Sequence, residues 1–315
     1  MGRRVLFGPV PSRRLGRSLG IDLLARKTCT LDCVYCECGP TEALTLERKE
    51  YVPTQDVLDE LDAFLAGRPA LDSITFSGSG EPTLHLGIGK IIHYIKDNYP
   101  EYPVTVLTNG TLLTDPAVRA ELVRADRVVP SLDAVSDAAF TAVNRPVPGL
   151  DNAAVIEGLV RFREEYHQQL WLEFFLVPGQ NDAPDELAAI AAAAARIRPD
   201  RVQLNTVARP PAEPDARAVS LDELDALAEL IPGFVEVIAD HPLPASNTEG
   251  RGSADLVLDL LRRRPCTLQD IAAGLDMHPN EVLKYTDRLV REGLVEHQEV
   301  AGRNYYSAPS TGDSA

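Results

Sequence analysis

Short apolar runs rich in β-branched residues alternate along this chain with longer stretches whose apolar positions recur every three or four residues. The short runs predict strands, and the longer stretches predict helices. The candidate strands are residues 18–24, 73–76, 104–107, 127–131, 170–177 and 201–205. A typical helical stretch follows Thr54, which we expect to be the N-cap residue of that helix.

The alternation of strand and helix repeats about six times. This order favours an α/β fold with a parallel sheet, closed or open, whose strands are joined by right-handed crossovers. The loops at the C-terminal ends of such strands would carry the chemistry.

The last part of the chain has a different pattern. Residues 240–252 are rich in Pro, Gly, Ser and Asn and predict an exposed linker. Beyond it the sequence predicts three helices and then two strands joined at Gly302, at residues 254–263, 267–274 (capped by Thr267), 279–293, 294–299 and 303–307. This order resembles a winged helix-turn-helix, so we divide the chain into residues 1–253, residues 254–308 and a disordered tail, 309–315.

In winged helix-turn-helix proteins the third helix enters the major groove of DNA. Here that helix would expose Lys284, Arg288 and Arg291. Residues 254–308, however, hold seven Lys and Arg against nine Asp and Glu. A docking or lid module that never meets nucleic acid is therefore an equal alternative.

The whole chain is acidic, with a formal net charge of −16 over 315 residues. Such a surface excludes broad attraction to nucleic acid or anionic lipid. No stretch approaches the roughly 18 apolar residues of a membrane span. Four of the five cysteines are clustered, which is unlike a secreted disulfide framework, so we expect a cytoplasmic protein.

The cysteine cluster is the strongest chemical signal. Cys29, Cys33 and Cys36 stand as Cys-x-x-x-Cys-x-x-Cys, with Cys38 two residues further on. Three thiolates would hold three corners of a 4Fe–4S cubane and leave one iron open, whereas a structural zinc site needs four protein ligands. Cys38 is then a spare thiol or a fourth ligand, and a zinc knuckle built from all four cysteines remains a further alternative.

This loop resembles the cluster loop of the radical S-adenosylmethionine (radical SAM) superfamily. The aromatic Tyr35 precedes the third cysteine, and residues 78–82, Gly-Ser-Gly-Glu-Pro, resemble the Gly-Gly-Glu-Pro motif, with Ser79 in place of a glycine. Thr-Asn-Gly at 108–110 and Ser-Leu-Asp at 131–133 end the next two strands. The resemblance covers roughly residues 18–210 and implies a partial (βα)6 barrel resembling a TIM barrel.

The resemblance also implies an activity. A 4Fe–4S cluster would reductively cleave S-adenosylmethionine to a 5′-deoxyadenosyl radical, which would abstract a hydrogen atom from a substrate that no motif identifies. A flavodoxin or a ferredoxin would supply the electron. The implied iron ligands are Cys29, Cys33 and Cys36, and the implied cofactor contacts are Tyr35, Gly80, Glu81, Pro82, Asn109, Ser131 and Asp133.

Two further features leave alternatives open. Arg13, Arg14 and Arg17 precede the first predicted strand and would bind an anion or form salt bridges. This N-terminal segment resembles that of enzymes described as wyosine-synthase-like Fe–S oxidoreductases, although the acidic composition gives tRNA no support. The competing hypothesis for the whole chain is an Fe–S or zinc redox sensor that binds DNA through its C-terminal domain.

Overall fold

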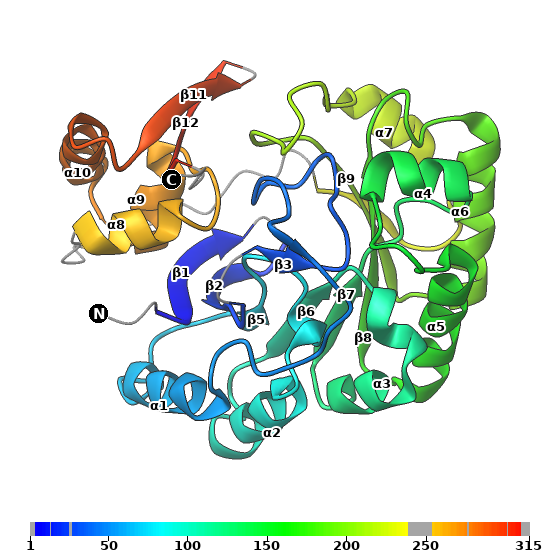
Figure 1. Ribbon diagram of the computed structural model, residues 1–315, viewed down its shortest axis with the longest axis horizontal. Helices are drawn as coiled ribbons and strands as arrows, with labels where there is room; N and C mark the ends of the chain where they lie inside the picture. The colour runs from blue at the N-terminus through cyan, green and yellow to red at the C-terminus, as the bar shows by residue number, and fades with distance from the viewer. Residues whose placement is uncertain are drawn as a thin grey trace.

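The computed structural model describes residues 4–12, 14–24, 27–238, 254–275, 277–300 and 302–309. Within them, eight strands form one curved sheet in the order β1-β2-β5-β6-β7-β8-β9-β10 (Figure 1). The strands are β1 (Leu6–Ser12), β2 (Gly16–Ile21), β5 (Ser73–Phe76), β6 (Val104–Thr108), β7 (Arg127–Pro130), β8 (Gln169–Leu176), β9 (Arg201–Thr206) and β10 (Val235–Val237). All neighbours are parallel except β1 and β2. The six predicted strands and the α/β class are confirmed, and β1 and β10 extend the sheet.

Helices cover the outer face of the sheet (Figure 1). They are α1 (Thr54–Leu65), α2 (Ile88–Asn98), α3 (Pro116–Leu122), α4 (Asp137–Asn144), α5 (Asn152–Glu165), α6 (Pro184–Ile197) and α7 (Leu221–Ala228). The prediction for Thr54 was wrong. Pro53 is the N-cap of α1 and makes no side-chain cap bond, while the Thr54 hydroxyl donates to Glu50.

Alternate residues of each strand face the helices, because successive side chains of a strand point to opposite sides. In β5, Ile74 and Phe76 are fully buried in the main hydrophobic core. Ser73 and Thr75 face the other way, where Ser73 donates to Thr105 at 2.9 Å and Thr75 bonds Ser18 at 2.7 Å. The concave face of the sheet is therefore lined partly by hydroxyl groups.

Of the N-terminal arginines, Arg14 reaches across to the far strands of the sheet. Its Nη1 lies 2.9 Å from Oε1 of Glu173 on β8 and 3.3 Å from Oε1 of Gln203 on β9. The structure thus supports the salt-bridge alternative for Arg14. Arg13 lies outside the described residues.

The C-terminal part contains three helices and a hairpin, as predicted. They are α8 (Ala254–Leu261), α9 (Leu268–Leu275), α10 (Pro279–Arg291), β11 (Glu296–Val300) and β12 (Arg303–Ser307). The amide of Asp270 donates to Oγ1 of Thr267 at 3.1 Å, which confirms the cap of α9. The predicted linker and the tail beyond residue 309 lie outside the described residues.

This C-terminal unit packs on the edge of the sheet, beside β1 (Figure 1). Val10 of β1 shares a buried cluster with Val257 and Ile271. The same interface contains an ion pair, in which Nε of Arg263 lies 3.5 Å from Oδ2 of Asp22, the residue that follows β2. Both side chains are at most 5% exposed. The winged-helix unit therefore supplies a buried counter-charge to the barrel.

A second contact joins the unit to the loop that follows β9. The Tyr305 hydroxyl of β12 donates to the Ala208 carbonyl at 2.7 Å. The neighbouring Arg209 is buried and forms an ion pair with Glu37, at 2.8 Å.

Among the helices that the structure describes, we find none with the length and apolar character of a membrane span.

We expect Arg263→Met to lower the free energy of unfolding of the full chain by about 3–5 kcal/mol, because it leaves Asp22 buried without this counter-charge. Urea unfolding measures the change. Arg262→Met is the matched control, since the Arg262 side chain is 59% exposed and pairs only at the surface. Equal stability of the two variants would contradict the structural role of the ion pair.

Candidate active site

The cysteine loop runs from the C-terminal end of β2 to α1. Two short strands within it, β3 (Thr28–Cys29) and β4 (Ala43–Leu44), pair in parallel. The next thiols lie on tight turns, in which the Cys36 amide donates to the Cys33 carbonyl at 3.1 Å and the Gly39 amide to the Cys36 carbonyl at 3.2 Å. All four cysteine residues of the loop are half-buried.

The loop is held to the Gly-Ser-Gly-Glu-Pro segment by backbone pairing. The Thr28 amide donates to the Ser79 carbonyl at 3.2 Å, and the Glu81 amide donates to the Thr28 carbonyl at 3.1 Å. A Cβ on Gly80 would lie only 1.8 Å from the Thr28 carbonyl oxygen. Only glycine permits so close an approach of the two backbones.

Glu81 ties this segment to the end of β6. Its Oε1 accepts from the Thr83 hydroxyl at 2.5 Å and from the Thr108 hydroxyl at 2.6 Å, and its Oε2 accepts from the Asn109 amide at 2.7 Å. Burial raises the pKa of Glu81. Both carboxylate oxygens thus have partners within the protein, and Glu81 fixes the geometry of the rim.

Ser79, which departs from the expected glycine, also has a structural partner. Its hydroxyl donates to Oδ2 of Asp22 at 2.7 Å. Asp22 is the residue that pairs with Arg263 of the C-terminal unit. Through Asp22, the serine therefore connects the motif to the winged-helix unit.

Each of the three motif thiols lies within hydrogen-bond distance of one nitrogen from a different part of the chain. Nδ2 of Asn109 is 3.5 Å from Cys29 Sγ, and Nδ2 of Asn144, at the end of α4, is 3.4 Å from Cys33 Sγ. Nζ of Lys27 is 2.9 Å from Cys36 Sγ. The loop thus offers three sulfur atoms, each with an N–H donor.

These surroundings fit a bound cluster. Burial raises the pKa of Cys29 to about 12 and that of Cys33 well above its ordinary value, so these two thiols lose their protons when they bind metal and not before. A hydrogen bond from Cys38 and the charge of Lys27 lower the pKa of Cys36. A buried ammonium group surrounded by thiols is costly unless the thiols are anionic, as they are when they bind metal.

A site for a single metal ion would need its ligands to converge on one point. Among the described residues, no three His, Cys, Asp or Glu side chains converge on one metal ion. The cysteines of a cubane bind different irons, so they need not converge on a single ion. Sγ of Cys38 lies 3.2 Å from the Gly78 carbonyl oxygen, so this thiol is also held at the loop, and its role as a spare thiol or a fourth ligand stays a prediction.

Asp133 joins the cysteine loop to β8 and α4. Its Oδ1 accepts from the Phe175 amide at 3.0 Å, and its Oδ2 accepts from Asn144 at 2.7 Å and from the Tyr35 hydroxyl. The Tyr35 ring stacks on Phe175 with 3.8 Å between centroids. Burial raises the pKa of Asp133 to about 6. Tyr35 and Asp133 therefore hold the loop against β8 and α4.

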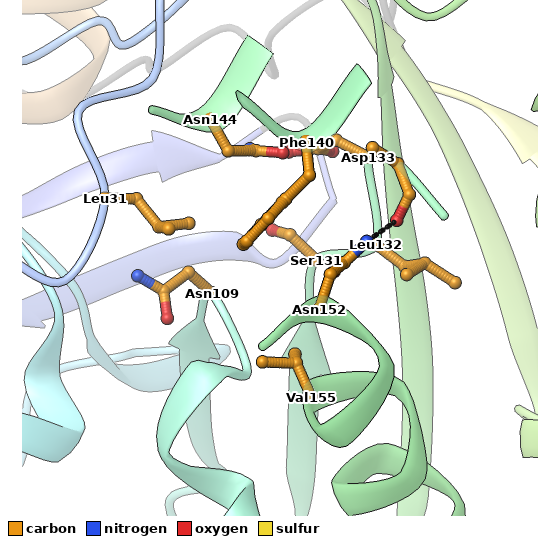
Figure 2. A pocket seen from close by; sticks show the side chains of 10 residues that line it. Leu31, Asn109, Ser131, Leu132, Asp133, Phe140, Asn144, Asn152 and Val155 are labelled. Atoms are coloured by element: carbon orange, nitrogen blue, oxygen red, sulfur yellow. Dashed lines mark hydrogen bonds between the residues drawn. The ribbon is translucent and has the colours of Figure 1, made fainter. Parts of the chain in front are cut away.

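Three of the predicted cofactor contacts line one pocket beside the loop. Figure 2 shows Asn109, Ser131 and Asp133 around it, at the ends of β6 and β7, together with the apolar Leu31 and Phe140. The loop after β8 supports this pocket from behind. Asn181 is fully buried and donates to the carbonyls of Asp133 and Phe175, so it holds this edge instead of lining the pocket.

Comparison with known families decides the class of this site. The sequence model described as the radical SAM superfamily matches residues 26–194, which is more than half of the chain. The chain belongs to the radical SAM superfamily. It is therefore an enzyme, and the cofactors of its class are S-adenosylmethionine and a 4Fe–4S cluster. A second model, the IclR helix-turn-helix domain, matches residues 256–299 and confirms the winged-helix class of the C-terminal unit.

The chain also has near full-length relatives. A UPF0026 protein of Helicobacter pylori is 31% identical over 307 residues, covering 96% of this chain and 97% of that protein. A Brachyspira hyodysenteriae protein named GTPase Obg is 34% identical over 300 residues, which is 94% of this chain and 44% of that protein. The chain thus spans less than half the length of the Brachyspira protein.

A solved structure shares the fold of the radical SAM core. The crystal structure of Streptococcus suis SuiB bound to S-adenosylmethionine superposes with a TM-score of 0.51 at 14% identity, over 69% of this chain and 50% of that chain. At this identity the likeness is one of fold.

The sequence patterns did not point to several residues that surround the thiols. Lys27 stands two positions before Cys29 and directly after Arg26, so its place beside the cysteine loop was the available signal. Asn144 lies 111 residues from Cys33, and no local pattern marks it. Asp22 and Arg263 likewise meet only through the fold.

We expect Gly80→Ala to reduce the iron and acid-labile sulfide bound after anaerobic reconstitution by at least half, because the new Cβ would displace Thr28 and the cysteine loop. Gly67→Ala is the control, since the nearest atom to a Cβ there is a carbonyl oxygen at 4.0 Å. Wild-type iron content in Gly80→Ala would show that the backbone pairing does not position the loop.

Proposed function

We propose that this chain binds its 4Fe–4S cluster through Cys29, Cys33 and Cys36 and reductively cleaves S-adenosylmethionine, generating a 5′-deoxyadenosyl radical that abstracts a hydrogen atom from a substrate. The observation that carries this proposal is the pairing of Thr28 with Ser79 and Glu81. This pairing holds the cysteine loop against the Gly-Ser-Gly-Glu-Pro segment, so the three thiols lie beside the residues that we propose as cofactor contacts, Gly80 and Pro82 among them.

When bound, the cluster supplies the electron that breaks a carbon–sulfur bond of the sulfonium cofactor. We assign the chain three tasks around it. The thiols of Cys29, Cys33 and Cys36 hold the cluster. The backbone around Gly80 and Pro82, with Asn109 and Ser131, lines the cofactor site.

The third task is positioning, which falls to the buried acids and Tyr35. Glu81 holds the end of β6, and Asp133 holds Tyr35 and the start of α4 by the hydrogen bonds described above. Fixed contacts of this kind keep reacting groups within the small tolerances that radical transfer needs. The apolar Leu31, Leu132 and Phe140 restrict water at the pocket.

The electron must come from outside the chain, and we assign it to a flavodoxin or a ferredoxin. We also propose the division at residue 253 as the boundary between the radical SAM core and the winged-helix unit, residues 254–308. The first helix of that unit begins at Ala254.

Replacement of Cys33 by Ala should abolish both cluster binding and the release of 5′-deoxyadenosine from S-adenosylmethionine in the presence of dithionite, because the cluster loses one of three ligands. Cys38→Ala should retain both. Iron and sulfide analysis and chromatography of the nucleoside measure these outcomes. Loss of the cluster in Cys38→Ala would instead make Cys38 a fourth ligand and close the site to the cofactor.

Nucleic-acid binding by the C-terminal unit is the second candidate function. It is favoured by the match to a helix-turn-helix family and by exposed Lys284, Arg288 and Arg291 on α10. The wing carries opposite charge, because Glu296 and Glu299 on β11 are exposed. Arg288 also lies 4.0 Å from Glu292, which offsets part of its charge.

We therefore expect the full chain to bind mixed-sequence duplex DNA no more tightly than about 10⁻⁶ M at 150 mM salt, the range of nonspecific association. Fluorescence anisotropy measures this. A dissociation constant below about 10⁻⁸ M for one sequence, lost in a Lys284→Ala/Arg288→Ala variant, would instead establish specific DNA recognition.

A further inference from the structure

Lys27 is a cation buried against the sulfur ligands. It is only 6% exposed, and its Nζ lies 2.9 Å from Cys36 Sγ and donates to the Gly39 carbonyl. The groups whose negative charge acts on it are the thiols of Cys36, Cys38 and Cys29. Within the described part of the chain, Lys27 forms no ion pair with a carboxylate; its counter-charge is sulfur.

The other two ligand thiols receive neutral donors that are shared with oxygen acceptors. Nδ2 of Asn109 is 2.8 Å from the Thr30 hydroxyl and 3.5 Å from Cys29. Nδ2 of Asn144 is 2.7 Å from Asp133 and 3.4 Å from Cys33. Charge-assisted hydrogen bonds are roughly twice as strong as neutral ones, so Lys27 has the largest effect of the three.

We propose that Lys27 is the fixed counter-charge of the iron–sulfur cluster and raises its reduction potential, while Asn109 and Asn144 add weaker contributions at the other two sulfurs. The inference rests on the proposed ligand set of Cys29, Cys33 and Cys36. One electron from the flavodoxin or ferredoxin adds one negative charge to the cluster, and no bond to Lys27 forms or breaks. A buried cation stabilises the reduced state more than the oxidised state, because the reduced state is the more negative.

The size of the effect follows from the burial. The ammonium is shielded from solvent and touches a sulfur ligand directly, so screening by water is weak. We expect its removal to lower the ratio of reduced to oxidised cluster at a fixed potential by at least tenfold, which is about 59 mV for a one-electron couple.

The test compares Lys27→Met with Lys27→Arg. The first keeps most of the length of the side chain and removes its charge, and the second keeps the charge. Both full-length variants and the wild type are reconstituted with iron and sulfide, assayed for both, and titrated with dithionite under electron paramagnetic resonance, without S-adenosylmethionine or substrate. Lys27→Met should require a more negative potential for half-reduction, and Lys27→Arg should stay within about twofold of the wild-type ratio.

Coincident titration curves for Lys27→Met and the wild type would overturn the inference. If Lys27→Met fails to take up iron while Lys27→Arg takes it up, the positive charge at this position is required for the cluster to bind, which supports its role as the counter-charge. If both variants lose iron equally, the charge is not what matters and the inference fails.

Failure of the proposed function would be visible elsewhere. The wild type itself would then bind no cubane cluster, or would bind one and release no 5′-deoxyadenosine. Failure of the present inference is confined to the difference between the variants and leaves the wild-type spectrum and the nucleoside product unchanged.

Discussion

The site depends on one close approach of two backbones. Thr28 of the cysteine loop and residues 79–81 of the loop after β5 pair through two hydrogen bonds, and the absence of a side chain at Gly80 makes the distance attainable. Without this pairing the cysteine loop would keep its contacts with α4, where the Asp32 and Val34 amides donate to the Asn144 and Val143 carbonyls, but it would lose its contact with the segment after β5. With it, the sulfur atoms lie at the C-terminal edge of the sheet, where the strand ends present Asn109, Ser131 and Asp133.

The buried carboxylates at this edge form their hydrogen bonds with other residues of the chain. Glu81 and Asp133 are each at most 4% exposed, and each accepts at least three hydrogen bonds from neighbouring segments. A buried carboxylate is tolerated when its oxygens are satisfied in this way. Both residues were expected to contact the cofactor, and the structure shows how the same acids can matter by holding the strand ends in place.

The regular part of the fold was readable from the sequence because the parallel strands are buried and apolar on their outer faces. The two edge strands were not readable. β1 contains a glycine and two prolines and pairs with an irregular register between Phe7 and Val10, and β10 has only three residues. Proline and irregularity are typical of edge strands, where a missing amide donor is tolerated.

The candidate site divides in the same way. Motif spacing identified the cysteines, because three ligands on one short loop must be close in sequence. Lys27 had a local signal that spacing rules do not use. Asn144 and Arg263 had none, because their partners lie 111 and 241 positions away and the contacts exist only after folding. The role of Ser79 could be understood only once Asp22 was seen beside it.

The ion pair between Arg263 and Asp22 also bears on how this architecture was assembled. A small helix-turn-helix domain is usually regarded as a unit that can be joined to different proteins without changing their fold. Here the C-terminal unit contributes a guanidinium beside Asp22, at the C-terminal end of β2, and a tyrosine to the loop beside Arg209. Removing residues 254–308 would leave Asp22, the partner of Ser79, without that guanidinium, so the barrel and the C-terminal helices form one structural unit.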